Sequence, residues 1–405
     1  MRQSTRSEIG LLIGHVIQIL LGIQVGMIGV GWPYIQKSFG LGFESLGLLV
    51  GGGMLARLFS SFASGRLIGQ LGLRKFILGG VMLFGIGSLG YGLAPSWAVL
   101  LLSAFIAGLG DSAFGSGLST YVVSNYNARR LNWLQGVFGL GLMIGPQLIT
   151  WLVRDLGHPW QFVYLLVGAA ICVLWLLLIP LSADWQLIPH HVEGQAPLRP
   201  ASVRQTLKLR LLWLCLAVFF VYGGAEVATG QFVNALYTDG RGIDPRTVST
   251  WITLFWLGFT VGRLGLGSIV DRIGKTRLIR FSTVGIILGS LMIWLYRDPN
   301  LSYLGLLLTG LSLGPIFPTL TAQSGERFGL AHMANAVGFQ MGAGALGAAV
   351  LPSIAGSLAV QLSIEAIPIM LVIQAIVLLA LHEYMLVYGK REASPRVLSP
   401  KLDQV

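Results

Sequence analysis

The chain has 405 residues, of which 54% are hydrophobic and only 11% are charged. Soluble domains carry about 25% charged residues, so the composition excludes an ordinary soluble protein and indicates a polytopic helical membrane protein. The formal net charge of +11 does not indicate nucleic acid, because the basic residues lie in short loops between apolar runs and not on one basic face.

Apolar runs long enough to cross a bilayer, which takes about 20 residues, follow one another along the whole sequence. The breaks between them carry turn or charge signals, as at Asp298-Pro299-Asn300. We predict twelve transmembrane helices near residues 9–36, 42–68, 76–93, 97–124, 131–155, 158–181, 209–238, 247–270, 278–296, 302–324, 335–361 and 365–389.

The longest polar segment between two predicted spans is residues 182–208, at the midpoint of the chain. It contains prolines, charges and a pair of histidines, a composition typical of a loop. We expect a cytoplasmic linker there, between an N-terminal six-helix bundle at 1–181 and a C-terminal six-helix bundle at 209–389. Residues 390–405 are expected to form a cytoplasmic tail.

The two halves of the chain align with each other at an offset of 202 residues. This offset places Gln24 on Glu226 and Gly145 on Gly347, and it superimposes the segments 65–75 and 267–277. A parallel repeat of two helical halves is an architecture of membrane transporters. The predicted fold class is an all-α membrane protein with twelve transmembrane helices in two six-helix bundles.

Lysine and arginine are distributed unequally between the two sides of this arrangement. The side that holds the N-terminus, the linker and the C-terminal tail has 20 basic residues, the opposite side has 5, and Arg57 and Arg263 lie inside spans. The positive-inside rule then predicts a multi-pass protein of the cytoplasmic (inner) membrane with both termini in the cytoplasm. A monomer is the expected state.

The loop after the eighth span reads Gly-Ser-Ile-Val-Asp-Arg-Ile-Gly-Lys-Thr-Arg at 267–277, which resembles a signature of the major facilitator superfamily. The copy at 65–75 keeps the glycines and the basic end but has Gly69 and Gln70 in place of the acid and the first arginine. The resemblance implies two rocking bundles with a gate at the cytoplasmic face. The candidate gating residues are Asp271, Arg272, Arg263, Glu326 and Arg74.

Three short patterns in the second half, at 222–226, 256–263 and 314–319, resemble the fucose-permease-like branch of this superfamily. The branch contains proton-linked and sodium-linked sugar transporters, so the resemblance implies a sugar symporter. The branch often has an acid in the fourth span and an asparagine four residues later. Here Gly115 and Ser119 align with those positions, and Asp111 lies one helical turn earlier.

Two acids, Asp111 and Glu226, lie in the middle of predicted spans, where a carboxylate costs several kcal/mol and therefore faces water or a partner. Arg57 lies at a similar depth in the second span, which neighbours the fourth in this superfamily. An Asp111–Arg57 pair would be either a protonation switch or a fixed strut. Arg263 lies nearer the cytoplasmic end, where we expect it to meet Asp271 or Glu326 and not Glu226.

Uncharged polar and aromatic residues in the expected cavity-lining spans suit a ligand with hydroxyl groups and an apolar ring face. Gln18 belongs to this wider set, and Pro315 and Pro318 are expected to kink or loosen the tenth span beside it. The candidate substrate-binding residues are Gln24, Glu226, Tyr222, Asn234, Gln231, Gln147, Trp256, Phe317 and Thr321.

The function predicted is secondary active transport by alternating access of a small polar solute, with a sugar as first choice, coupled to H⁺ or Na⁺ through Glu226, Asp111 and Arg57. The alternative is a proton-driven exporter of amphipathic drugs or lipids, which the Gly141-x-x-x-Gly145-Pro146 pattern favours. A membrane sensor without transport is a third reading, which the short cytoplasmic segments disfavour. The sequence shows no phosphate-binding loop or metal-ligand spacing, so we expect no enzyme, cofactor or metal site.

Overall fold

The computed structural model describes residues 3–41, 45–185, 201–295 and 298–397, and this part of the chain is helical without any strand. Eleven of its helices are long and apolar enough to cross a bilayer. The predicted span at 247–270 is not among these eleven and is formed by an α-helix and a following π-helical turn. The prediction of an all-α, multi-pass membrane fold is confirmed.

The N-terminal bundle contains six long helices. They are α1 (Gln3–Phe39), α2 (Ser45–Leu71), α3 (Leu73–Leu93), α4 (Trp97–Asn125), α5 (Ala128–Ile149) with its π-helical continuation η1 (Thr150–Asp155), and α6 (Trp160–Leu181). A short helix α7 (Val203–Leu207) lies within the predicted linker, of which residues 186–200 are outside the described part of the chain.

The C-terminal bundle contains the counterparts of these helices. They are α8 (Arg210–Ala235) with η2 (Leu236–Gly240), α9 (Pro245–Val261) with η3 (Gly262–Leu266), α11 (Lys275–Trp294), α12 (Pro299–Leu313) with α13 (Ile316–Ala322) and α14 (Ser324–Phe328), α15 (Leu330–Gln361) and α16 (Ala366–Val397). A single turn, α10 (Val270–Ile273), precedes α11.

The two bundles repeat one packing pattern. In the first, α1 packs on α5 and α3 packs on α4 and α6; in the second, α8 packs on α15 and α11 packs on α12 and α16. The closest approaches explain why Gly145 and Gly347 align in sequence. A Cβ at Gly145 would lie 2.4 Å from the main-chain oxygen of Ile23, and one at Gly347 would lie 1.8 Å from that of Phe220. Only glycine lets these helices pack so closely.

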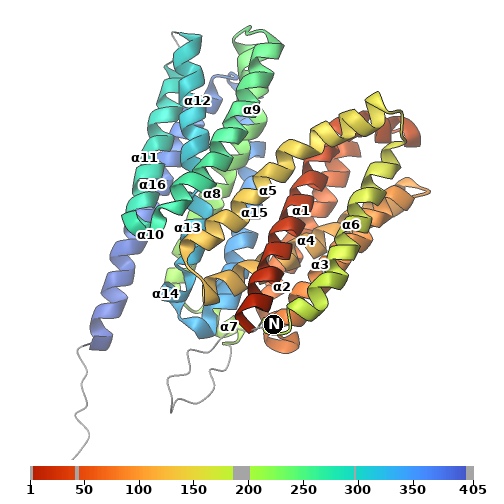
Figure 1. Cartoon of the computed structure of the whole chain (residues 1–405). Coiled ribbons are helices and arrows are strands. Elements are labelled where there is room, and N and C mark those ends of the chain that lie inside the picture. The colour runs from red at the N-terminus through yellow and green to blue at the C-terminus, as the bar shows by residue number, and fades with distance from the viewer. Residues whose placement is uncertain (1–2, 42–44, 186–200, 296–297, 398–405) are drawn as a thin grey trace, which may run out of the picture.

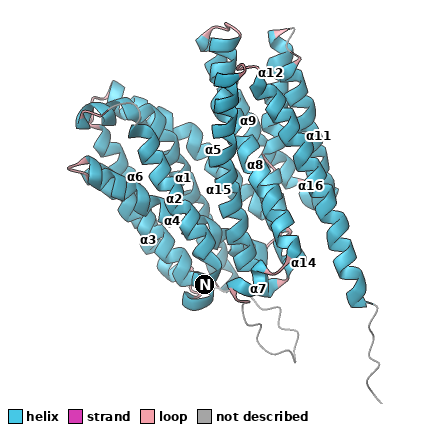
Figure 2. Cartoon of the chain, turned by 180° about the vertical axis from the view of Figure 1, so that it is seen from behind, coloured by secondary structure: helices cyan, strands magenta, loops and turns pink. Residues whose placement is uncertain are grey.

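The bundles contact each other through α2 against α15 and α5 against α9. They diverge toward the end of the molecule opposite the N-terminus and stay together at the end near it, as Figures 1 and 2 show from opposite sides. Hydrogen bonds fix the joined end: Asn132 on α5 donates to Thr319 on α13 over 3.2 Å, and Trp133 donates to Ser268 over 2.8 Å.

The tenth span is broken where the sequence predicted a kink. Its α-helix ends at Leu313 and resumes at Ile316, with Gly314 and Pro315 between the two parts. Proline lacks the amide hydrogen that would continue the helical hydrogen bonding. The break leaves the main-chain oxygens of Leu313 and Gly314 as acceptors for side chains from neighbouring helices.

Candidate functional site

A cavity of about 280 Å³ lies between the two bundles. Helices α1, α2, α4 and α5 line it from the N-terminal bundle, and α8, η3, α13 and α15 line it from the C-terminal bundle. Its polar lining side chains are Gln18, Arg57, Ser61, Asp111, Ser112, Gln135, Tyr222, Glu226 and Arg263. Each bundle therefore contributes one acid and one arginine to the same cavity.

The first ion pair joins Arg57 on α2 to Asp111 on α4, with 2.5 Å between Nη2 and Oδ2. The predicted Asp111–Arg57 pair is therefore present. Arg57 is 35% exposed and Asp111 15% exposed, because both face the cavity. Ser112 donates a hydrogen bond of 2.9 Å to the main-chain oxygen of Arg57 and holds the two helices together.

The second ion pair joins Arg263 on η3 to Glu226 on α8, with 3.7 Å between Nη2 and Oε2. The prediction that Arg263 meets Asp271 or Glu326 instead of Glu226 is wrong. Glu326 pairs with Lys275, at 2.5 Å. Helical side chains point toward the N-terminus of their own helix, which for this span is the direction of the cavity. The π-helical turn Gly262–Leu266 also changes the phase of the helix at this residue.

Arg263 is 5% exposed and has three further contacts. Its Nε donates to the main-chain oxygen of Gly314, at 3.1 Å, in the break of the tenth span. Its Nη1 donates to the main-chain oxygen of Gln135, also at 3.1 Å, across the bundle interface. Its guanidinium lies 4.2 Å from the centre of the Phe259 ring. One side chain thus connects the cavity, the broken helix and the other bundle.

Tyr222 and Phe317 both line the cavity, as predicted. Their ring centres are 5.8 Å apart, and the Tyr222 hydroxyl donates to the main-chain oxygen of Leu313 over 3.0 Å. The break in the tenth span supplies this acceptor. These two rings form an aromatic wall next to Glu226.

Gln24 does not line this cavity, although its repeat mate Glu226 does. Gln24 is 3% exposed and accepts a hydrogen bond from Ser88 on α3. It lines a second cavity of about 120 Å³ that also touches Arg57 and Asp111. The Arg57–Asp111 pair therefore borders both cavities.

Three other predicted substrate-binding residues lie away from the cavity lining. Thr321 is buried and donates to the main-chain oxygen of Phe317 over 2.9 Å. Trp256 packs edge-to-face against neighbouring phenylalanine rings of its own helix, and Gln147 is exposed on α5. The side chains of Gln231 and Asn234 lie outside the described residues.

The remaining candidate gating residues lie at the joined end of the bundles. Asp271 and Arg272 are exposed on α10. Arg74 donates to the main-chain oxygen of Ile179 over 2.7 Å and so ties α3 to α6 within one bundle. Their contribution to gating stays a prediction.

Sequence reasoning missed Gln135. Its side chain lines the cavity and its main-chain oxygen accepts the bond from Arg263. The available signal was a polar residue directly before Gly136 in an apolar span. Gln18, from the wider set, does line the cavity, and its Oε1 has no hydrogen-bond partner within the described chain.

Comparison with known proteins agrees with this architecture. The model of the Major Facilitator Superfamily matches residues 15–352 and 232–404. The cis,cis-muconate transport protein of Acinetobacter baylyi is 22% identical over 87% of each chain. The glucose/mannose transporter GlcP of Bacillus subtilis is 22% identical over 76% of this chain and 77% of its own.

Among solved structures, the major facilitator transporter FucP in its outward conformation superimposes with a TM-score of 0.77 at 15% identity, over 94% of this chain and 99% of its own. This likeness confirms the fold of two six-helix bundles. Together with the family match, it confirms the superfamily resemblance seen in the motifs and the prediction of a transporter and not an enzyme.

Proposed function

The chain belongs to the major facilitator superfamily, and on that premise we propose that it is a cation-coupled transporter of a small polar solute, with a monosaccharide as first choice. The observation that carries this proposal is the pairing of charges around one solute-sized cavity. Arg57–Asp111 comes from one bundle and Arg263–Glu226 from the other. A carrier needs both halves to contact the solute if its binding is to influence their relative position.

Proton coupling follows from the Arg57–Asp111 pair. A proton on Asp111 would cancel its charge and weaken its hold on Arg57, whose guanidinium could then donate to solute oxygens. Solute binding and protonation would reinforce each other, which is the thermodynamic requirement for symport. A site whose affinity for the ion were equal in both conformations would couple nothing.

Arg263 would connect this site to the change of access. Its bond to the main-chain oxygen of Gln135 crosses the bundle interface and must break when the joined end opens. A solute that draws Glu226 or Arg263 into new contacts would weaken that bond. In this scheme Arg263 is a gating residue that acts from the cavity, on the side of the joined end. Asp271, Arg272 and Glu326 act at the protein surface of that joined end.

Orientation completes the proposal. The 20 basic residues on the side of the N-terminus, against 5 on the other, support a cytoplasmic position of both termini in the inner membrane. The joined end in Figure 1 would then be cytoplasmic and the conformation outward-facing. A monomer would suffice, since both bundles of one chain surround the cavity.

The charges in the cavity wall favour a small polar solute over an amphipathic drug or lipid. Two ion pairs line the cavity, and a solute with oxygen groups can hydrogen-bond to them, whereas an apolar ligand would bury them without such partners. A second candidate is a small carboxylate, because two arginines line the cavity and the muconate transport protein is similar over most of its length.

Uptake into proteoliposomes under imposed pH or Na⁺ gradients tests the proposal, with labelled monosaccharides and small mono- and dicarboxylates as the panel. We expect one class to accumulate under a cation gradient. Glu226→Gln and Asp111→Asn should abolish that accumulation. Glu383→Gln is the matched control. Glu383 lies in the same bundle as Glu226 and pairs with Arg280, but it lines no part of the cavity. Absence of flux for both classes under every gradient would refute the small-solute proposal.

A further inference from the structure

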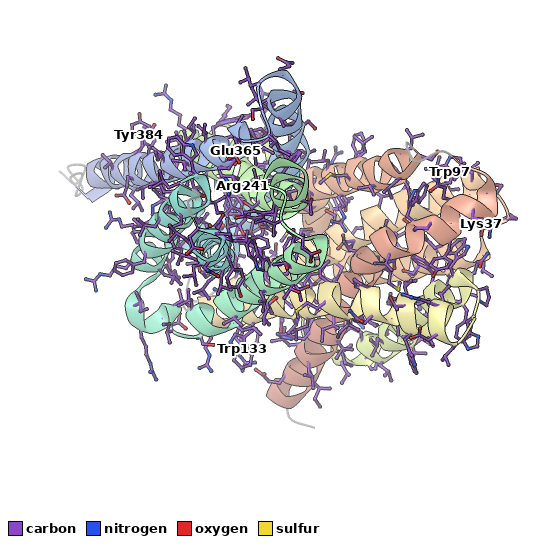
Figure 3. The ribbon with its side chains drawn as sticks, turned by 90° about the horizontal axis from the view of Figure 1, so that it is seen from above. Lys37, Trp97, Trp133, Arg241, Glu365 and Tyr384 are labelled. Carbon is purple, nitrogen blue, oxygen red and sulfur yellow. The ribbon has the colours of Figure 1, made fainter. Side chains whose placement is uncertain are left out.

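A second large hollow lies on the outer surface of the N-terminal bundle. It measures about 970 Å³, runs between the beginnings of α1 and α5, and shares no lining residue with the candidate solute site. We call it the α1–α5 groove. Trp133, one of its lining residues, lies at the periphery of the molecule in Figure 3 and is 42% exposed. The groove therefore faces the surroundings of the protein and not its interior.

One end of the α1–α5 groove is positively charged. Arg129 and Arg130 line it at the first turn of α5, where the helix dipole adds partial positive charge. Arg130 pairs with Glu8, the acid of the groove, at 3.1 Å, and both side chains are about half exposed. Arg129 lies 5.4 Å from the Trp133 ring centre and pairs with no carboxylate of the described residues. The groove thus has an arginine without a counter-charge.

The other part of the α1–α5 groove is apolar and open. Leu12 is 64% exposed, Val16 is 38% exposed, and Ile19 and Val137 continue the same wall. These side chains belong to membrane-spanning helices, so the medium that covers them is lipid hydrocarbon. The groove is therefore complementary to a phospholipid. Its cationic groups at the helix ends suit the phosphate, and its apolar channel, which runs into the membrane, suits an acyl chain.

We propose that the α1–α5 groove is a binding site for an anionic phospholipid. The phosphate of the lipid would lie on Arg129 and Arg130, and one acyl chain would lie along Leu12 and Val16. Basic pockets between transmembrane helices suit anionic headgroups, and the apolar wall selects a lipid over a soluble phosphate. Trp133 suits the headgroup level, where tryptophan is enriched in membrane proteins.

The bound lipid would favour one conformation of the transporter. Trp133 donates to Ser268 of the other bundle, and the neighbouring Gly136 packs against Leu264 of η3. A lipid that orders Trp133 and the start of α5 would therefore stabilise the joined end of the bundles. This consequence rests on the proposed alternating-access function, whereas binding of the lipid does not.

Binding can be measured by native mass spectrometry and by thermal unfolding of the purified full-length protein in detergent. The probes are phosphatidylglycerol, phosphatidylcholine with matched acyl chains, and soluble glycerol 3-phosphate. We expect phosphatidylglycerol to bind at least about tenfold more tightly than phosphatidylcholine and to raise the unfolding temperature. Glycerol 3-phosphate at the same concentration should do neither.

The variants separate the two parts of the site. Arg129→Gln/Arg130→Gln should weaken phosphatidylglycerol binding by about tenfold or more, since each basic residue contributes about fivefold near an anionic surface. Arg204→Gln/Arg210→Gln, two exposed arginines outside the groove, are the matched control and should change nothing. Val16→Trp fills the apolar channel, leaves both arginines in place and should weaken binding of the same lipid.

Glu8→Gln should change the affinity for phosphatidylglycerol in the opposite direction. It removes the acid that competes for Arg130, so phosphatidylglycerol should bind more tightly. The proposal is overturned if phosphatidylglycerol and phosphatidylcholine bind alike, if the Arg129→Gln/Arg130→Gln variant keeps the preference, or if glycerol 3-phosphate reproduces the lipid effect. These binding assays involve no transport, so failure of the transport proposal would leave their outcome unchanged.

Discussion

Arg263 on the C-terminal bundle donates a hydrogen bond of 3.1 Å to the main-chain oxygen of Gln135 on the N-terminal bundle. The same guanidinium lies 3.7 Å from the carboxylate of Glu226 in the cavity. A charged group that contacts both the site and the bundle interface can transmit a change at one to the other.

Replacing Arg263 by Gln should weaken the joined end of the bundles. A hydrogen bond to a charged group contributes about 1.5–3 kcal/mol, so the balance between outward-facing and inward-facing states should shift by at least about tenfold. Spin labels at Leu156 and Leu301, which are exposed at the diverging end, should report a shorter distance. Arg280→Gln, which removes an exposed ion pair of the same bundle, should leave the distance distribution unchanged.

Replacing Asp111 by Asn should separate coupling from solute exchange. The variant has no carboxylate to protonate, so gradient-driven accumulation should fall to background while exchange of labelled for unlabelled solute across the membrane persists. Loss of both activities to the same degree would argue that the Asp111–Arg57 pair is a strut and not a switch.

The same pair predicts a stability pattern. Asp111→Asn leaves Arg57 without its counter-charge, which should lower the free energy of unfolding by about 1–3 kcal/mol, less than for a fully buried pair because Arg57 is partly exposed to the cavity. The double variant Asp111→Asn/Arg57→Gln has no charge at either position, so its free energy of unfolding should recover most of that loss. Thermal unfolding in detergent measures both, and a double variant no more stable than the single one would contradict the interpretation.

Gly145→Ala and Gly347→Ala should each destabilise the fold by about 1–3 kcal/mol, the usual cost of overpacking a tight contact. In both cases the new methyl group would lie within 2.4 Å of a main-chain oxygen on the facing helix. Gly51→Ala is the matched control, since nothing lies within 4 Å of a Cβ there and the residue is helical. It should be neutral or slightly stabilising. Equal unfolding temperatures for the three variants would show that these contacts are looser than the structure indicates.

Gly72→Ala and Gly274→Ala should destabilise their loops to a similar extent. The two glycines precede α3 and α11 at matching places of the repeat, with φ of 81° and 93° and extended ψ of 153° and 135°. This region is essentially restricted to glycine, and another residue is strained there by about 1–3 kcal/mol. The first loop lacks the acid of the second, so the prediction separates backbone conformation from charge. Unfolding temperatures that fall only for Gly274→Ala would show that the charged residues dominate.

The sequence by itself determined the features that depend on composition along each helix. The positions of the spans, the repeat that brings Gly145 and Gly347 to equivalent contacts, and the kink at Pro315 all follow from local apolarity, glycine and proline. The Asp111–Arg57 pair could also be expected, because two opposite charges at one depth of neighbouring helices cost less together than apart.

The tertiary structure decided which side chains share the cavity. The sequence correctly predicted that Arg263 lies toward the joined end, from its depth along the helix. The partner of Arg263 depends on the direction of its side chain and on the π-helical turn at Gly262–Leu266. Gln24 and Glu226 occupy equivalent positions of the repeat, yet the packing of α3 buries Gln24 against Ser88 while Glu226 stays open to the cavity. Which face of a helix meets the cavity is set by side-chain packing between helices and not by the pattern within one helix.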